Sequence, residues 1–315
     1  MAAHGSRKVV LAAMIGNGLI AITKFGAAAY TGSSAMLSEA IHSVVDTTNQ
    51  VLLLHGLKRS TKAADAKHPF GYGREIYFYA FVVAVMIFGV GAGVSLYEGI
   101  EKVRHPHAAT DIFINYIVLG LALIFETYAW VIAFREFRKS KGSLGWFEAV
   151  RLSKDPAVFT VLFEDTAAVL GLLTAGIGIY LADTLQMPVL DGVASIVIGL
   201  ILAATAAFLA YECKGLLTGE ASLPEVVDSI RELAAAEAHI ESVNELLTMH
   251  MGPSDVLLTM SVDVSNNLPA GEVERLVSRL EGAIKERHDD ITRIFIEVQE
   301  GVEAQGLGGE GGEPA

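Results

Sequence analysis

The side chains best suited to bind a metal ion lie in one apolar stretch, residues 35–57. Glu39, His42 and Asp46 are spaced i, i+3 and i+7, so on a helix they share one face. Asn49 extends that face. A histidine and an aspartate four residues apart can bind one divalent cation, and this pair suits Zn²⁺ and its first-row neighbours. The alternative is a buried histidine–carboxylate pair that only holds helices together. Because a third carboxylate shares the face of a stretch that can lie in lipid, the metal site is the favoured interpretation.

Three acidic residues in later apolar stretches are further candidates. A charged group at the bilayer centre costs about 2.5–3.5 kcal/mol, so such groups usually face a bundle interior or a water path. We expect Asp165 to bind the metal from a second helix. Its neighbour Glu164 lies about 100° away around that helix. We expect Glu164 to bind the ion after its side chain rotates, to carry a proton, or to contact a ligand without binding the ion. Glu126 either completes the site or pairs with Lys24, which is the expected charge partner of one of these acids.

Metal binding by these residues would be linked to protons. A metal ion binds carboxylate and neutral imidazole, so metal ions and protons compete for the same groups. We expect His42, Asp46 and Glu164 to carry this coupling.

Six apolar blocks precede residue 213, and each has the roughly 20 residues that a helix needs to cross about 30 Å of hydrocarbon. They cover residues 9–30, 35–57, 77–100, 112–134, 157–181 and 189–211. Lysine and arginine gather in the loops after the second and fourth blocks and beside both ends, which places both termini in the cytoplasm. The sequence therefore predicts a multi-pass membrane domain of six transmembrane helices over residues 9–212, after a cytoplasmic segment of residues 1–8. No Arg-rich, acid-poor leader is visible, so a bacterial plasma membrane is the expected location.

Residues 213–301 are predicted to form a small cytoplasmic α+β domain with the element order α-β-β-α-β. Helices are expected at 224–238 and 272–288, and strands at 243–251, 256–264 and 292–298. The second strand alternates, with one set of side chains formed by Val256, Leu258, Met260 and Val262. Residues 302–315 are rich in Gly and Glu and are expected to be disordered.

The composition excludes several classes of protein. With 52% hydrophobic and 19% charged residues, the chain is more apolar and less charged than a soluble domain, which averages about 45–50% and 25%. Residues 213–315 hold 20 acidic and 7 basic residues, so the whole net charge of −13 lies there, which argues against a nucleic-acid partner. A single cysteine, Cys213, excludes a disulfide framework and a cysteine-cluster metal site.

Taken together, these features resemble the cation diffusion facilitator family of zinc transporters, over about residues 8–300. Besides the six blocks and the α-β-β-α-β order, the resemblance rests on the segments Ser38–Asp46, His68–Arg74 (HPFGYGR) and Asp165–Gly171. The segments Tyr72–Glu75 and Leu162–Asp165 are most similar to the branch that holds the eukaryotic ninth zinc transporter and bacterial relatives.

The resemblance implies a homodimeric antiporter that exchanges a divalent metal ion for protons by alternating access around a midplane site. The C-terminal domain would be ferredoxin-like and would pair the two subunits. Two residues from the second helix and two from the fifth would hold the ion. His42, Asp46 and Asp165 match these positions. The fourth position is Val161, which has no donor atom.

The missing fourth ligand leaves three carboxylates to consider. Glu164 lies at nearly the same depth as Asp165 and is our first choice, with Glu126 second. Glu39 lies about 10 Å from Asp46 along the helix axis, so it better suits a position on the path into or out of the site.

The loop after the second block matches the family in part. His68 matches a family metal ligand, whereas Tyr72 replaces the next histidine. We therefore expect His68, like Glu39 and Asn49, to serve a second site or a step on the ion's path.

In the C-terminal domain, the family's histidines fall on Ser261, Glu274 and Glu297. This argues against a zinc-binding C-terminal domain. His250 and His288 remain, but a histidine on a surface or in a strand is only rarely a metal ligand.

We therefore expect a divalent-metal exporter that works by proton antiport, with Zn²⁺ as the expected cargo and Mn²⁺, Fe²⁺ and Co²⁺ as alternatives. Its expected partners are the lipid bilayer, a second copy of the chain, metal ions and protons. Neither an organic cofactor nor an enzymatic activity is expected, and the lack of an HExxH motif or a Ser/Lys dyad argues against an intramembrane metallohydrolase. The remaining alternative is a non-transporting scaffold or metal sensor with a degenerate site, because Val161 cannot bind metal.

Overall fold

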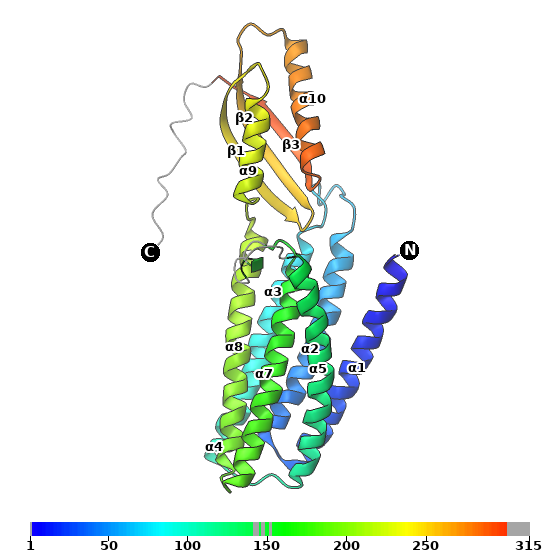
Figure 1. Ribbon diagram of the computed structural model, residues 1–315, viewed down its shortest axis with the longest axis vertical. Helices are drawn as coiled ribbons and strands as arrows, with labels where there is room; N and C mark the ends of the chain where they lie inside the picture. Colours follow the sequence, from blue (N-terminus) through cyan, green and yellow to red (C-terminus); the bar gives the residue numbers. More distant parts are fainter. Residues whose placement is uncertain (1, 141–144, 146–148, 151–152, 301–315) are drawn as a thin grey trace. The chain divides into compact units, whose positions relative to one another are not determined.

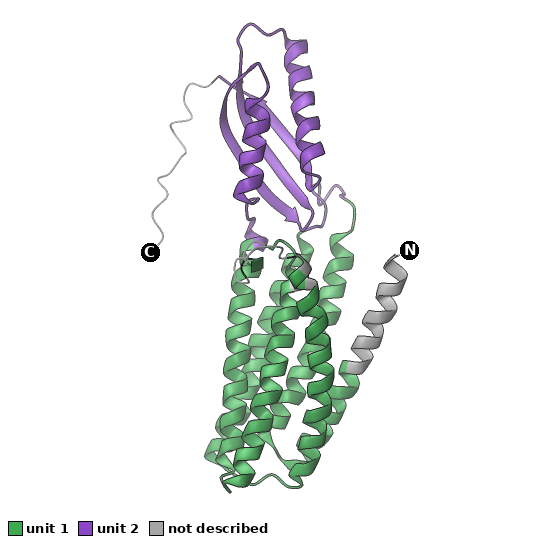
Figure 2. Ribbon diagram, viewed as in Figure 1, with its two compact units in different colours: residues 1–63, 74–215 green, residues 64–73, 216–315 purple. Residues whose placement is uncertain are grey.

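The computed structural model describes residues 2–140, 145, 149–150 and 153–300 (Figure 1). Contacts divide the chain into two compact units (Figure 2). The first holds the residues up to 63 together with 74–215, and the second holds 64–73 together with the residues from 216 onward. The tail that we expect to be disordered, residues 302–315, lies outside the described residues.

The first unit is built from long helices that enclose the six predicted apolar blocks. They are α1 (Ala2–Thr31), α2 (Ser34–Ser60), α3 (Glu75–Met86), η1 (Ile87–Ala92), α4 (Gly93–Arg104), α5 (Ile112–Ser140), α7 (Pro156–Thr184) and α8 (Val189–Thr218). The third block is a single helical rod in which the π-helical η1 joins α3 directly to α4. Such wide turns interrupt α-helices mostly over short segments, as here.

Four stretches in the described part of the chain are long and apolar enough to cross a membrane. They are Glu75–Arg104, Ile112–Arg135, Phe159–Thr184 and Val189–Thr218. Helix α2 is not among them. Its many polar residues, Glu39, His42 and Asp46 among them, lower its mean hydropathy. The first unit is therefore a helical domain with four apolar helices, and six membrane crossings stay a prediction.

Helices α4 and α8 pack closely through two glycines. A Cβ placed on Gly99 would lie 2.8 Å from the carbonyl oxygen of Gly192, and one placed on Gly192 would lie 2.9 Å from that of Gly99. A larger residue at either position would push the two helices apart.

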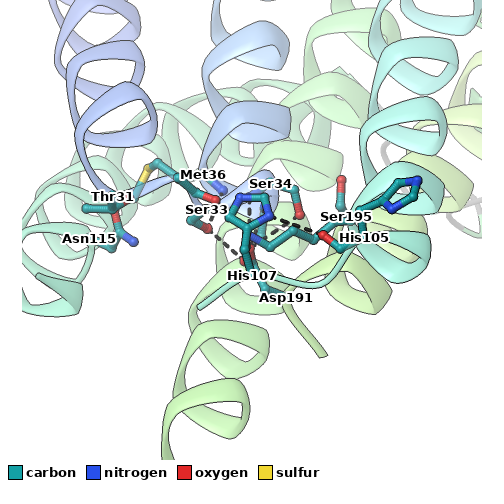
Figure 3. A network of polar contacts seen from close by, with 12 residues as sticks. Thr31, Ser33, Ser34, Met36, His105, His107, Asn115, Asp191 and Ser195 are labelled. Carbon is teal, nitrogen blue, oxygen red and sulfur yellow. Dashed lines mark hydrogen bonds and ion pairs between the residues drawn. The ribbon is translucent and has the colours of Figure 1, made fainter. Parts of the chain in front are cut away.

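The first turn of α2 is anchored by Asp191 of α8 (Figure 3). The Ser33 hydroxyl donates to Asp191 Oδ1 at 2.7 Å, and the Ser34 backbone N–H donates to Oδ2 at 2.8 Å. An anion at a helix N-terminus satisfies free N–H groups and the helix dipole. Lys102 of α4 lies 3.7 Å from the same carboxylate and donates to the Gly32 carbonyl at 2.7 Å. These contacts fix the depth of α2, and with it the depth of the candidate ligands on that helix.

The second unit has the predicted order α-β-β-α-β. Its elements are α9 (Pro224–Ala235), β1 (Ile240–Gly252), β2 (Asp255–Val264), α10 (Ala270–Arg287) and β3 (Ile291–Val298). Strands β1 and β2 form an antiparallel hairpin, and β3 adds parallel to β2. A parallel pair needs a crossover connection, which α10 supplies.

The core of this unit lies between the sheet and the two helices. Val256, Leu258, Met260 and Val262 of β2 are all buried, which confirms the alternation predicted for this strand. They form one cluster with buried side chains of α9 and α10, among them Ile230, Ala234, Leu276, Leu280 and Ile284. Each helix buries its apolar stripe on the same face of the sheet.

Candidate metal site

His42 and Asp46 face each other on α2, one helical turn apart. The distance from His42 Nδ1 to Asp46 Oδ1 is 3.4 Å, and the imidazole is only 1% exposed. Neither ring nitrogen of His42 nor Oδ1 of Asp46 forms a hydrogen bond with another described residue. A buried polar atom without a partner costs roughly 1–3 kcal/mol, and a shared cation would satisfy Asp46 Oδ1 and one of the two ring nitrogens. The pair therefore has the properties of a ligand pair more than those of a structural hydrogen bond.

Glu164 of α7 is held toward α2 by Asn49. The Asn49 side-chain amide donates to Glu164 Oε1 at 2.9 Å, and both residues are buried. Asn49 lies on the same face of α2 as His42 and Asp46, so this bond brings the Glu164 carboxylate to the face of α2 that carries the candidate ligands.

Carboxylates of two other helices act on this face of α2. The charges of Glu126 on α5 and of Glu164 and Asp165 on α7 all act on Asp46. Glu126 and Glu164 are buried and Asp165 is half-buried. Like charges held together in a low dielectric repel one another, so the cluster favours a cation. Among the described residues, no three histidine, cysteine or acidic side chains converge closely enough to hold an ion, and the ligand set stays a prediction.

Lys24 of α1 forms a buried salt bridge with Glu39 of α2. The Lys24 ammonium lies 3.1 Å from Glu39 Oε2 and donates to the Ser43 hydroxyl at 2.8 Å. The expectation that Lys24 neutralises one of the membrane acids is confirmed, with Glu39 rather than Glu126 as its salt-bridge partner. Sequence reasoning did not single out Ser43, although it follows His42 directly and lies one helical turn beyond Glu39.

His68 lies in a compact turn in the loop of residues 64–73. Its Nδ1 is 3.6 Å from Asp65 Oδ1, and the Tyr72 hydroxyl donates to Asp65 Oδ2 at 2.7 Å. The rings of His68 and Tyr72 are stacked at a tilt, with centroids 4.2 Å apart. Tyr72 is thus a hydrogen-bond donor to the acid that contacts His68.

The same loop packs against strands β1 and β3 within the second unit. Arg293 of β3 donates to the Phe70 carbonyl at 2.8 Å, and its guanidinium lies 5.2 Å from the centre of the Phe70 ring. Gly73 lies directly against the backbone of Met251 and Gly252, where a Cβ would clash with the Met251 carbonyl oxygen. These contacts explain why residues 64–73 group with the second unit although they connect α2 to α3.

The change Gly73→Ala is expected to loosen this loop. The added methyl group meets backbone, which cannot rotate away, and overpacking of this kind typically costs about 1–3 kcal/mol. Hydrogen exchange of a peptide that covers residues 64–73 should become faster. The control is Gly282→Ala on α10, where a Cβ meets open space and helix propensity predicts a small gain in stability. Unchanged exchange in Gly73→Ala would show that the close approach is not maintained in solution.

Ser261, Glu274 and Glu297, which the resemblance aligns with histidines, do not lie together on one element. Ser261 and Glu297 are direct neighbours across β2 and β3, whereas Glu274 lies on α10. His288 is in hydrogen-bond contact with the Ser229 hydroxyl, with Nε2 and Oγ 3.0 Å apart. His250 is buried in β1.

Comparisons with known proteins also divide the chain into two parts. Residues 10–218 match the model of the cation efflux transmembrane domain, and residues 223–300 match that of the cytoplasmic domain of cation efflux proteins. The mitochondrial proton-coupled zinc antiporter SLC30A9 of Xenopus laevis is 36% identical over 82% of this chain and 47% of its own length. Human SLC30A9 is 34% identical over 82% and 46%, and metal tolerance protein C4 of Arabidopsis thaliana is 26% identical over 84% and 58%. The chain spans about half the length of the curated relatives it matches.

Proposed function

The chain belongs to the cation efflux family, and from that premise we propose that it exchanges a divalent cation for protons across a membrane, with Zn²⁺ as the cargo. The observation that carries the proposal is the buried His42–Asp46 pair, whose facing atoms lack hydrogen-bond partners. Three further carboxylates act on Asp46. Relatives named as proton-coupled zinc antiporters support the choice of cargo and of counter-ion. The family consists of transporters, in agreement with the expectation of a protein without enzymatic activity.

The proposed ion site contains His42, Asp46 and Asp165, with Glu164 as the fourth ligand and Glu126 as the second choice. The contact from Asn49 supports Glu164, because it holds that carboxylate on the ligand face of α2. Val161, one helical turn before Asp165, leaves the usual fourth position without a donor atom. Mn²⁺, Fe²⁺ and Co²⁺ remain alternative cargoes, since imidazole and carboxylate bind all of them.

The proposed topology has six membrane crossings, made by α1, α2, the α3–η1–α4 rod, α5, α7 and α8. The distribution of Lys and Arg supports cytoplasmic termini. We further propose that the C-terminal domain, of the ferredoxin-like type, pairs two copies of the chain. A bacterial plasma membrane stays our proposed location, although the animal relatives are named mitochondrial.

Proton coupling follows from competition for the ligands. Metal binds His42, Asp46 and Glu164 only in their deprotonated forms, so a falling pH releases metal and a rising pH favours its binding. When the site is open to an acidic compartment, protons therefore displace the metal ion, which is released into that compartment. The protons are then carried to the opposite side. Alternating access of the bundle then completes one exchange cycle.

Flux in proteoliposomes tests the proposal. With a lumen more acidic than the medium, zinc uptake is expected to accelerate while the lumen becomes more alkaline. Collapse of the pH gradient with an ionophore should slow uptake to the rate seen without a gradient. A scaffold or sensor with a degenerate site would not move metal, so the absence of gradient-dependent uptake would favour that alternative.

The isolated domain of residues 223–301 is expected to dimerise weakly without metal and to bind zinc poorly. The reason is that Ser261, Glu274 and Glu297 stand where the family has imidazoles. Calorimetry with Zn²⁺ and ultracentrifugation measure the two properties. A tight, stoichiometric zinc site would contradict this prediction.

A further inference from the structure

Lys24 is a fully buried charged group in the helical unit that the proposed ion site does not use. Its side chain is fully buried on α1, and its ammonium contacts Glu39 and Ser43 of α2. Burying an ammonium is costly unless it is paired and hydrogen-bonded. The position therefore needs a reason beyond helix packing, which an apolar side chain would serve at a lower cost.

Glu39 uses only part of its bonding capacity in this pair. Oε2 receives the Lys24 ammonium, whereas Oε1 has no hydrogen-bond partner among the described residues. Gly171 of α7 lies against Oε1 so closely that any side chain there would clash with the carboxylate. The carboxylate thus occupies a confined space between α1, α2 and α7, with Lys24 as its salt-bridge partner, and the charge of Glu126 also acts on it.

The Lys24 ammonium also lies near the proposed ion site. It contacts Ser43, which is the residue after His42 and lies one helical turn before Asp46. Its charge acts on His42, Asp46 and Glu126 as well as on Glu39. A divalent ion bound by Glu39 would have to approach within a few ångströms of this ammonium, and like charges repel strongly in a low dielectric.

We infer that Lys24 is a specificity-determining residue: a tethered cation that occupies Glu39 and so confines the transported ion to the His42–Asp46 end of α2. Glu39 is then a partner of Lys24 and not a position on the ion's path. With Lys24 present, the ion meets one imidazole nitrogen and a limited set of carboxylates. Without it, an ion can also bind at the Glu39 end of this face, where the Glu39 carboxylate and the Ser43 hydroxyl supply oxygen ligands, which favour harder ions such as Mn²⁺ over Zn²⁺.

This inference rests on the proposed function, and metal binding tests it separately from transport. The full chain and its variants are purified in detergent, and their affinities for Mn²⁺ and Zn²⁺ are measured by equilibrium dialysis at one pH. Lys24→Met is expected to raise the Mn²⁺ to Zn²⁺ affinity ratio by about tenfold. Lys24→Met combined with Glu39→Gln removes both charges and should bring the ratio back to within about threefold of the wild type. Lys24→Arg keeps the positive charge and should also keep the wild-type preference.

The outcomes separate the two proposals. If Lys24→Met folds and keeps the wild-type ratio, the pair is only structural and the inference is wrong, whatever the transport assay gives. If Lys24→Met does not fold, the inference is tested with the double variant. It is overturned if the double variant loses zinc binding or if its Mn²⁺ to Zn²⁺ affinity ratio differs from that of the wild type by more than about threefold. If the wild type binds zinc but moves none into proteoliposomes, the transport proposal fails. The affinity ratios of the variants still test the role of Lys24 in that case.

Discussion

Replacing Asp46 or Asp165 with asparagine is expected to reduce proton-driven metal flux to the level of protein-free liposomes. Asparagine keeps the shape of the side chain and removes the negative charge, so the change tests the ligand charge and not the packing. For Asp46 the structure gives a specific reason, because Oδ1 faces the buried His42 imidazole without forming a hydrogen bond. Asp165 contributes charge from a second helix, as the family position implies.

The control for this prediction is Asp183→Asn, the same chemical change at an exposed position near the end of α7. It should leave flux close to the wild-type value. Size-exclusion chromatography must show normal insertion and assembly for all three variants. Transport by Asp46→Asn at nearly the wild-type rate would disprove the site assignment.

The second large effect is expected for Glu164→Gln, which should weaken metal binding and uncouple metal from protons. A glutamine keeps a carbonyl oxygen, so the hydrogen bond from Asn49 and the link between α2 and α7 can remain. The change therefore removes one negative charge while the helix packing is preserved. Metal affinity and the number of protons exchanged per ion are the quantities to measure.

A second substitution makes this prediction sharper. Val161→His in the Glu164→Gln background restores a donor atom one turn before Asp165 and should recover part of the metal affinity. Glu126→Gln is the matched comparison, because Glu126 is also a buried acid whose charge acts on Asp46. If Glu164→Gln leaves both quantities unchanged while Glu126→Gln abolishes them, Glu126 is the fourth ligand and our order of preference is reversed.

The sequence by itself determined the elements and their order. Apolar blocks of about 20 residues predict helices because a chain in lipid must satisfy its backbone hydrogen bonds internally, and each predicted block lies within a helix of the structure. Alternation in Val256–Val264 predicted a strand with one buried face, and that face is buried. The His42–Asp46 pair was also predictable, because residues four apart on a helix are always neighbours.

Only the tertiary structure decided which groups meet across helices. In the structure Lys24 forms a salt bridge with Glu39 rather than with Glu126, and Asn49 donates a hydrogen bond to Glu164. Asp191 accepts a hydrogen bond at the start of α2. The tertiary structure also grouped the loop of residues 64–73 with the second unit, through Gly73 and Arg293. Local periodicity cannot supply these pairings, because they depend on the rotation and depth of each helix. Those are set by the packing of many side chains at once, as the glycine contact between α4 and α8 illustrates.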